Sequence, residues 1–330
     1  MDTPEMRFLS AESYYQALLH GIPQARQRII IHAMDMRWGN RLEAFIPLLI
    51  AAAGRGVEVC LVGDMYSKFH ASMPHMNRTK SNNWSYVTHI RDQLRAGGVM
   101  VTYTGKIGLN PFAHRTHSKI TLLDDQIFTF GGVNFSSDSF ANTDYMLEMH
   151  DTILADRLHR LVKTIEADEK QSLPDLEELL GGTATLLFDG GTPKKSIIYE
   201  TACKVVGSAK KVYYVSQMCP SGKLAKQITA TANECYFIKP SQADPPANFA
   251  LIFDKARYKI TNHYTGKRYI HAKFILTEDK NGSKHIISGS NNFSWRGIAF
   301  GTKEIAVHST DPILWQAMYD FLQTEIVNAA

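Results

Sequence analysis

The stretch HRTHSKITLLDDQIFTFGGVN, residues 114–134, places polar residues around two short apolar runs. The runs at 120–123 and 127–130 are separated by two aspartates, which predicts two buried strands joined by a tight turn. Side chains alternate along a strand, so a histidine and a lysine two residues apart should point the same way. The residues that frame the two predicted strands are His117, Lys119, Asp124, Gly131, Gly132 and Asn134.

The same unit occurs a second time in YIHAKFILTEDKNGSKHIISGSNNFS, residues 269–294. The second copy is longer at 279–282, where Asn-Gly is typical of an extended hairpin turn. An acidic residue follows each copy at a similar separation, so it belongs to the repeated pattern. The residues of the second copy that match the first are His271, Lys273, Gly289, Ser290 and Asn292, and the acids that follow the two copies are Asp144 and Glu304.

The repeat extends beyond the motif. Residues 14–36 and 196–218 each read as a helix followed by an apolar strand. The chain therefore repeats a whole domain. We expect an α/β fold of two domains related by a pseudo-two-fold axis, 1–182 and 183–330, each a mixed β-sheet flanked by helices. The boundary is placed within 172–196, where proline and paired glycines interrupt the pattern.

The double motif resembles the signature of the phospholipase D superfamily, His-x-Lys-x4-Asp followed by Gly-Gly/Ser-x-Asn. The first copy has Asp124 in the acidic position, whereas the second has Glu278 there with Asp279 beside it. This acid is expected to brace the strand turn. Gly132 stands where many members have serine. That variant, with DYMLEMHDTIL at 144–154, looks most like the cardiolipin synthase and phosphatidyltransferase branch.

Two imidazoles suit the cleavage of a phosphodiester, because histidine can act as nucleophile, base or acid near neutral pH. Attack by a ring nitrogen on phosphorus would give a covalent phosphohistidine and divide the displacement into two steps. The resemblance implies that His117 is the nucleophile and His271 the general acid/base, although the sequence itself is symmetric. The expected roles of the other residues are charge neutralisation by Lys119 and Lys273, amide hydrogen bonds from Asn134 and Asn292, ring orientation by Asp144 and Glu304, a phosphate contact by Ser290, and close backbone approach at Gly132.

For several other residues an ordinary structural role is the simpler interpretation. Glu148 is an alternative to Asp144 as the acid that orients a histidine. Residues 65–87 and 237–249 are expected to be loops, either lids over the site or plain surface excursions. The residues that could contact substrate, but are more simply surface or core residues, are His114, His150, Trp38, Trp84 and Trp295.

The composition, 44% hydrophobic and 21% charged, excludes a disordered chain. A net charge of +4 is compatible with an anionic substrate or membrane face, but too small to indicate a nucleic-acid-coating protein. The four cysteines form no Cys-x-x-Cys pair, so neither a zinc site nor a disulfide framework is indicated. The N-terminus has no signal-peptide pattern, and no apolar run approaches the ~20 residues of a membrane span. We expect a cytoplasmic protein, at most peripheral on a membrane, without metal, cofactor or obligate protein partner.

The resemblance and the motifs together predict a phospholipase D-like phosphodiesterase or phosphatidyltransferase acting on a phospholipid, with one active site between the repeats. The alternative is a nuclease of the same superfamily, since the fold and motif do not choose the substrate. The chain lacks a basic stripe with interleaved aromatic residues, which disfavours nucleic acid. A binding scaffold without turnover is the third candidate, disfavoured because both His-Lys pairs are intact.

Overall fold

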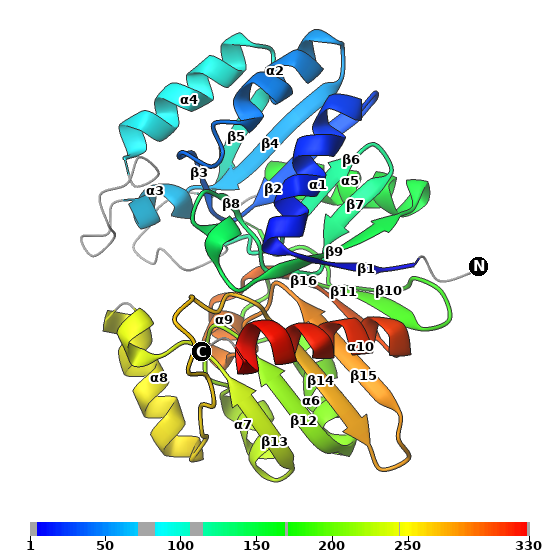
Figure 1. Cartoon of the computed structure of the whole chain (residues 1–330), viewed down its shortest axis with the longest axis vertical. Coiled ribbons are helices and arrows are strands. Elements are labelled where there is room, and N and C mark those ends of the chain that lie inside the picture. Colours follow the sequence, from blue (N-terminus) through cyan, green and yellow to red (C-terminus); the bar gives the residue numbers. More distant parts are fainter. Residues whose placement is uncertain (1–4, 72–82, 106–114, 169–170, 244, 329–330) are drawn as a thin grey trace.

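The computed structural model describes residues 5–71, 83–105, 115–168, 171–243 and 245–328. Within these ranges the chain forms two seven-stranded mixed sheets and a small two-stranded ribbon. Figure 1 shows the two sheets one above the other, each with helices packed on it. The expected α/β fold of two mixed sheets is confirmed.

The first sheet has the strand order β1-β9-β7-β6-β2-β4-β5, in which β2, β4 and β5 are parallel neighbours. The remaining neighbours pair antiparallel. The elements of this half are β1 (Arg7–Ser10), α1 (Ala11–Gln24), β2 (Arg28–Ala33), β3 (Met36–Arg37), α2 (Phe45–Gly54), β4 (Glu58–Asp64), α3 (Tyr66–Ala71), α4 (Trp84–Ala96), β5 (Met100–Thr104), β6 (Ile120–Leu123), β7 (Gln126–Thr129), β8 (Phe135–Ser136), β9 (Tyr145–His150) and α5 (Thr152–Ala167).

The second sheet has the order β10-β11-β16-β15-β14-β12-β13, with β12 and β13 parallel and the other pairs antiparallel. Its elements are β10 (Leu176–Leu179), β11 (Ala184–Gly190), α6 (Ile197–Ser208), β12 (Ala209–Val215), α7 (Gly222–Thr229), β13 (Ala232–Tyr236), α8 (Pro245–Tyr258), β14 (Phe274–Asp279), β15 (Lys284–Gly289), α9 (Trp295–Phe300), β16 (Lys303–Ser309) and α10 (Pro312–Phe321).

Six strands of each sheet follow the same order, since β1-β9-β7-β6-β2-β4 corresponds to β11-β16-β15-β14-β12-β13. The helix caps repeat as well. Ser10 and Ser196 accept hydrogen bonds from backbone N–H groups at the starts of α1 and α6. Asp151 and Asp311 do the same for α5 and α10, each cap stabilising its helix by about 1 kcal/mol. The duplication is therefore visible in topology and in local chemistry.

The boundary between the two sheets differs slightly from the predicted domain boundary. Strand β10 lies N-terminal to residue 183, yet it pairs with β11 in the second sheet. The domain limits 1–182 and 183–330 stay a prediction. The loop predicted at 237–249 is wrong from Pro245 onward, where α8 begins. The loop predicted at 65–87 contains α3 and the start of α4, and its residues 72–82 lie outside the described ranges.

Both motif hairpins form where the apolar runs predict them, but the strands begin after the basic pairs, at Ile120 and Phe274. Asp124 accepts hydrogen bonds from the backbone N–H groups of residues 26–28, which fixes β2 beside β6. In the second hairpin Asp279 accepts from two N–H groups of its own turn. Asp279 thus braces the turn where Glu278 departs from the signature.

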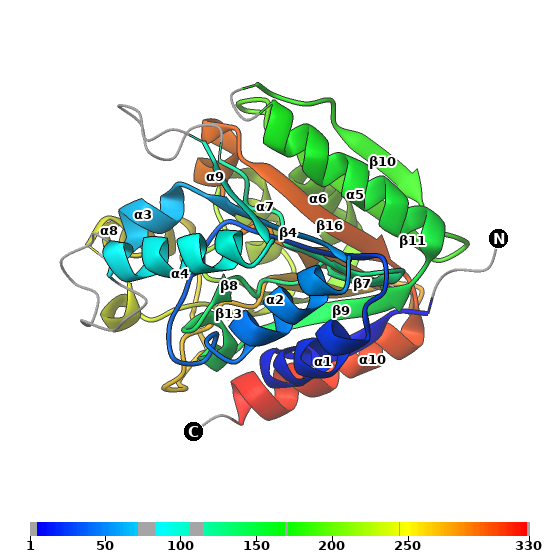
Figure 2. The same ribbon diagram turned by 90° about the horizontal axis from the view of Figure 1, so that it is seen from above.

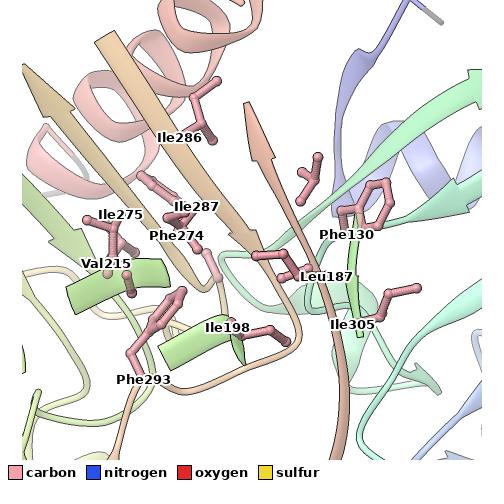
Figure 3. Close-up of a cluster of buried hydrophobic side chains, with 14 of the residues drawn as sticks. Phe130, Leu187, Ile198, Val215, Phe274, Ile275, Ile286, Ile287, Phe293 and Ile305 are labelled. Carbon is pink, nitrogen blue, oxygen red and sulfur yellow. The ribbon is translucent and has the colours of Figure 1, made fainter. Parts of the chain in front are cut away.

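Aromatic side chains join the two halves. Tyr145 of β9 packs on Phe8 of β1, on Phe274 of β14 and on Phe321 of α10, with ring centroids 5.1–5.9 Å apart. Figure 3 shows Phe130 of the first half among buried side chains of the second, and one continuous hydrophobic cluster contains both sets. The two halves therefore share a core, and the motif hairpins are anchored on either side of it.

None of the helices in the described ranges combines the length and the apolar character that crossing a bilayer requires.

We expect Gly131→Ala to destabilise the protein by about 3 kcal/mol or more, because a side chain there overpacks a strand contact. A Cβ on Gly131 would lie 2.0 Å from the carbonyl oxygen of Tyr145. Gly54→Ala is the matched control, since a Cβ there meets nothing within 4 Å. It should leave stability unchanged or raise it by about 0.5 kcal/mol. Urea unfolding measures both; similar stabilities for the two variants would contradict the close strand approach.

Candidate active site

Each motif histidine is paired with the acidic residue of the other half. His117 Nδ1 lies 3.0 and 3.1 Å from the two carboxylate oxygens of Glu304. His271 Nδ1 lies 2.7 Å from Oδ2 of Asp144. All four side chains are buried. The sequence predicts that these acids orient the histidines, and the structure shows that the pairing crosses between the repeats.

Backbone hydrogen bonds hold the crossed pairs in place. The His117 N–H donates to the carbonyl oxygen of Lys303 at 2.8 Å, and the Lys303 N–H donates to Arg115 at 2.8 Å. In the other half the His271 N–H donates to the carbonyl oxygen of Thr143 at 3.0 Å. Lys303 and Thr143 immediately precede Glu304 and Asp144. Each histidine segment is therefore fastened to the segment that carries its acid.

The carboxylates determine which ring nitrogen carries the proton. A carboxylate can only accept a hydrogen bond, so Nδ1 of each neutral ring is the protonated nitrogen. Neither His117 nor His271 has a second hydrogen-bond partner on its ring among the residues that the structure describes. Nε2 of each ring is left with a free lone pair, which is the form a nucleophile or a general base requires.

The two motif lysines are buried and interact with each other. Nζ of Lys119 donates to the carbonyl oxygen of His117, and Nζ of Lys273 donates to that of His271, both at 2.5 Å. Burial, followed by the charge of Lys273, lowers the pKa of Lys119 to about 7. Burial lowers the pKa of Lys273 to about 8. An anion bound beside the two lysines would offset their repulsion and favour their charged forms.

The histidines favour the neutral state in the absence of an anion. Burial lowers the pKa of His117, and Glu304 offsets part of this effect. Burial and the charge of Lys273 lower the pKa of His271 to about 4, with Asp144 opposing the shift. A bound phosphodiester anion would screen the lysines and raise both pKa values. Substrate binding can therefore prepare one ring to act as an acid.

The two motif asparagines have different environments. The side-chain oxygen of Asn134 accepts a hydrogen bond from the N–H of Asp35 at 3.2 Å, so the amide Nδ2 is directed away from that contact. The side-chain oxygen of Asn292 is buried and has no hydrogen-bond partner within the described ranges. Its backbone carbonyl oxygen accepts from Tyr214 and Ser216. The predicted hydrogen bonds of the two asparagines to a phosphate stay a prediction; the structure orients the Asn134 amide through its contact with Asp35.

Gly132 and Ser290 occupy matching positions and support the two acids differently. A Cβ on Gly132 would lie 2.5 Å from Oδ1 of Asp144, so the shorter acid fits only against glycine. The hydroxyl of Ser290 donates to Glu304 and accepts from the N–H of Ile305 at 3.0 Å. Ser290 therefore holds the longer acid in place here; its predicted contact with a phosphate stays a prediction.

A buried ion pair that the sequence analysis missed positions the first motif. Arg115 Nη1 lies 2.7 Å from Oδ1 of Asp64, at the end of β4. Asp64 also accepts from the N–H of Thr116 at 3.2 Å. Burial raises the pKa of Asp64, and Arg115 opposes this shift. In the sequence Asp64 stands out as a charged residue at the end of an apolar run, but its partner Arg115 lies 51 residues away.

A second missed acid, Asp189, lies opposite Glu304 in the register of β11 and β16. It accepts hydrogen bonds from the hydroxyl of Ser196 and the N–H of Ile198. Burial raises the pKa of Asp189 to about 7. The pKa of Glu304 moves the other way: burial opposes ionisation, but the interactions with His117 outweigh it and lower the pKa. The pKa values of these two neighbouring acids therefore shift in opposite directions.

None of the other predicted residues that the structure describes belongs to the crossed pairs. Glu148 forms an ion pair with Arg7, so Asp144 is the acid that holds a histidine. Trp295 is 45% exposed and lines a separate pocket of about 440 Å³. The other residues are Trp38, which is buried against Phe135, Trp84, which packs on Tyr103, His150, which is exposed, and His114, which lies outside the described residues.

The described part of the chain contains no group of three or more His, Cys, Asp or Glu side chains arranged to hold a metal ion. The four cysteines are buried free thiols.

The crossed pairs and the duplicated sheet agree with the comparisons to known proteins. A family model for the cardiolipin synthase, PLD-like domain matches residues 18–165, which include the first motif and Asp144. The first half of the chain therefore matches a phospholipase D-like domain. Cardiolipin synthase B from Shigella flexneri is 28% identical over 161 residues, which cover 45% of this chain and 35% of that protein. The Escherichia coli K12 protein of the same name is 28% identical over 164 residues, with the same coverage. The matched region is thus about a third of these relatives' length.

Two solved structures extend the likeness over nearly the whole chain. Phosphatidylserine synthase from Haemophilus influenzae Rd KW20 superposes with a TM-score of 0.69 at 12% identity, covering 98% of this chain and 86% of its own. Polyphosphate kinase from Porphyromonas gingivalis gives a TM-score of 0.61 at 12% identity, covering 97% and 46%. At these identities the comparison shows a shared fold, which includes both halves of this chain.

We expect the wild-type protein to lose stability relative to His271→Gln as the pH falls from about 6.5 towards 4. The unfolded chain binds a proton on this histidine near pH 6.5, whereas the folded chain binds it only near pH 4. Acid therefore favours the unfolded state of the wild type, by at most about 1.4 kcal/mol per pH unit.

Urea unfolding of both proteins across this pH range measures the difference. His150→Gln, which removes an exposed histidine, is the control for the substitution itself. Parallel stability profiles for the wild type and His271→Gln would contradict a buried, neutral His271.

Proposed function

We propose that this chain is a phosphatidyltransferase or phosphodiesterase that acts on a phospholipid through a covalent phosphohistidine. The observation that carries the proposal is the pair of carboxylate-held histidines, each followed by a buried lysine, at the junction of the two halves. The match to a cardiolipin synthase domain model supports a phospholipid as the substrate. The likeness to phosphatidylserine synthase supports a fold compatible with this chemistry.

In the first step, Nε2 of His117 attacks phosphorus while the bond from phosphorus to the leaving oxygen breaks. Lys119, Lys273 and the motif asparagines neutralise and hold the non-bridging oxygens. His271, protonated on Nε2 once the substrate anion is bound, gives its proton to the leaving alkoxide. The products of this step are a free alcohol, a phosphohistidine and a neutral His271.

In the second step, the neutral His271 removes a proton from water or from an acceptor alcohol. The oxygen then attacks phosphorus, the bond from phosphorus to His117 Nε2 breaks, and both histidines return to their starting states. Water gives hydrolysis and an alcohol gives transfer. The lysines supply the positive charge that a metal ion supplies in other phosphodiesterases, so the proposed reaction is metal-independent.

We expect His271→Ala to accumulate a covalent adduct on His117 when the substrate carries a nitrophenolate leaving group. Such a leaving group needs no proton, so the first step survives, whereas the second lacks its base. His117→Ala should form no adduct. Intact-protein mass spectrometry after a mildly alkaline quench, followed by peptide mapping, detects and locates the phosphorus.

Circular dichroism confirms that both variants are folded, and His150→Ala serves as the control for loss of a histidine outside the site. A label on His271 in the His117→Ala protein would reverse the two roles. No adduct in either folded variant would indicate direct attack by water and would rule out the covalent mechanism.

We expect the wild-type protein, in the presence of excess chelator, to convert phospholipids in mixed micelles to phosphatidic acid or, with an added alcohol, to a new phosphatidyl ester. His117→Ala should form neither product. Lipid mass spectrometry measures both. Cleavage of single-stranded DNA without lipid turnover, with a steep dependence on salt, would assign the chain to the nucleases instead. Turnover that chelator abolishes and a divalent ion restores would contradict charge neutralisation by the lysines.

A further inference from the structure

Helix α8 exposes an apolar patch, formed by Phe249, Ile252 and Phe253, on the surface of the second half. Their side chains are 74%, 54% and 47% exposed. A spacing of three and four residues places them on one face of the helix. The rings of Phe249 and Phe253 are stacked, with centroids 6.5 Å apart. These side chains form one continuous surface, which we call the α8 patch.

The opposite face of α8 already packs against the protein. Ala250 and Leu251 are buried, and so is Asp254. A surface helix of a globular protein normally has one apolar face, which points to its own core. Helix α8 has two, and the second is exposed. An exposed cluster of large apolar side chains is typical of a surface that binds another protein or a membrane.

The exposed charged residues of α8 are basic. Lys255 and Arg257 are exposed, and their positions in the helix place them on either side of the patch. The Arg257 guanidinium lies 5.9 Å from the centre of the Phe253 ring. The one acidic residue of α8, Asp254, is on the buried face. An apolar stripe flanked by cations is the pattern of a helix that lies in the interface of an anionic bilayer.

Hydrogen bonds connect α8 with the segment that carries the second motif asparagine. The Tyr258 hydroxyl, at the end of α8, accepts from the N–H of Gly222 at 3.0 Å. The hydroxyl of the neighbouring Ser221 accepts from the N–H of Trp295, three residues after Asn292. Figures 1 and 2 show α8 on the same side of the molecule as α3, with α3 in the upper half of Figure 1 and α8 in the lower half. The patch thus has a fixed position relative to the candidate active site.

We propose that α8 docks the protein on an anionic membrane surface, with the α8 patch inserted among the lipids and Lys255 and Arg257 at the headgroups. This inference rests on the proposed function in one respect only: a phospholipid substrate places the enzyme at a bilayer. The patch takes no part in the chemistry, so a soluble phosphodiester should be turned over without it.

The test compares binding to sedimented vesicles of phosphatidylcholine with and without roughly a third phosphatidylglycerol. The wild type should bind the vesicles that contain phosphatidylglycerol more tightly than those of phosphatidylcholine alone. Phe249→Ser and Phe253→Ser together should weaken binding about 100-fold, because each removes an inserted aromatic side chain. Lys255→Gln with Arg257→Gln should weaken it about 10-fold, and the loss should shrink at high salt.

Ile313→Ser is the matched control, since Ile313 is 80% exposed on α10, outside the patch. It should bind vesicles like the wild type, and all variants should turn over a soluble phosphodiester like the wild type. If the wild type turns over the soluble substrate but does not bind anionic vesicles, the docking proposal fails while the proposed chemistry stands. Equal losses for Ile313→Ser and the phenylalanine variant would also overturn it. So would a dimer in light scattering that the phenylalanine variant dissociates without losing vesicle binding, since the patch would then bind a second copy of the chain.

Discussion

The crossed pairing of carboxylate and imidazole is the constraint on which the rest of the site depends. His117 requires Glu304 and His271 requires Asp144, so neither half holds its own histidine in a defined tautomer. Burying two lysines, two histidines and two carboxylates is costly unless their charges are balanced. The balance exists only when the two halves are docked. The shared aromatic cluster around Tyr145, the residue after Asp144, is the apolar contact that maintains this docking.

The pseudo-symmetry of the fold is broken inside the site. Asp144 reaches one histidine with a short side chain and lies against Gly132, which has no side chain to obstruct it. Glu304 reaches the other with a longer side chain, and the Ser290 hydroxyl holds it. The glycine beside Asp144 and the serine beside Glu304 thus compensate for the one methylene group by which the two acidic side chains differ in length. Two histidines of the same sequence motif thereby acquire different surroundings, which an enzyme needs when one ring must attack and the other must transfer protons.

The two halves differ most in the segment that follows the parallel strand pair, β2 and β4 in the first half and β12 and β13 in the second. In the first half α4 leads into β5, which extends the sheet beside β4. In the second half α8 follows β13, and the chain then returns to His271 without adding a strand. The second sheet therefore ends at β13, whereas the first continues beyond β4 to β5. The exposed face of α8, formed by Phe249, Ile252 and Phe253, is the surface that we propose docks on a membrane.

The sequence alone predicted the duplicated α/β fold, the two motif hairpins and the residues that the structure brings together, because these depend on local periodicity and on an unusual double motif. It did not predict that a helix begins at Pro245, because the proline and polar residues there are typical of a loop. The helix is stabilised by the packing of Ala250 and Leu251 against the rest of the protein. It also could not decide which acid holds which histidine. Asp144 is 127 residues from His271, and Glu304 is 187 from His117. Nothing local distinguishes a pairing within a repeat from a pairing between repeats; only the docking of two sheets around a common core does.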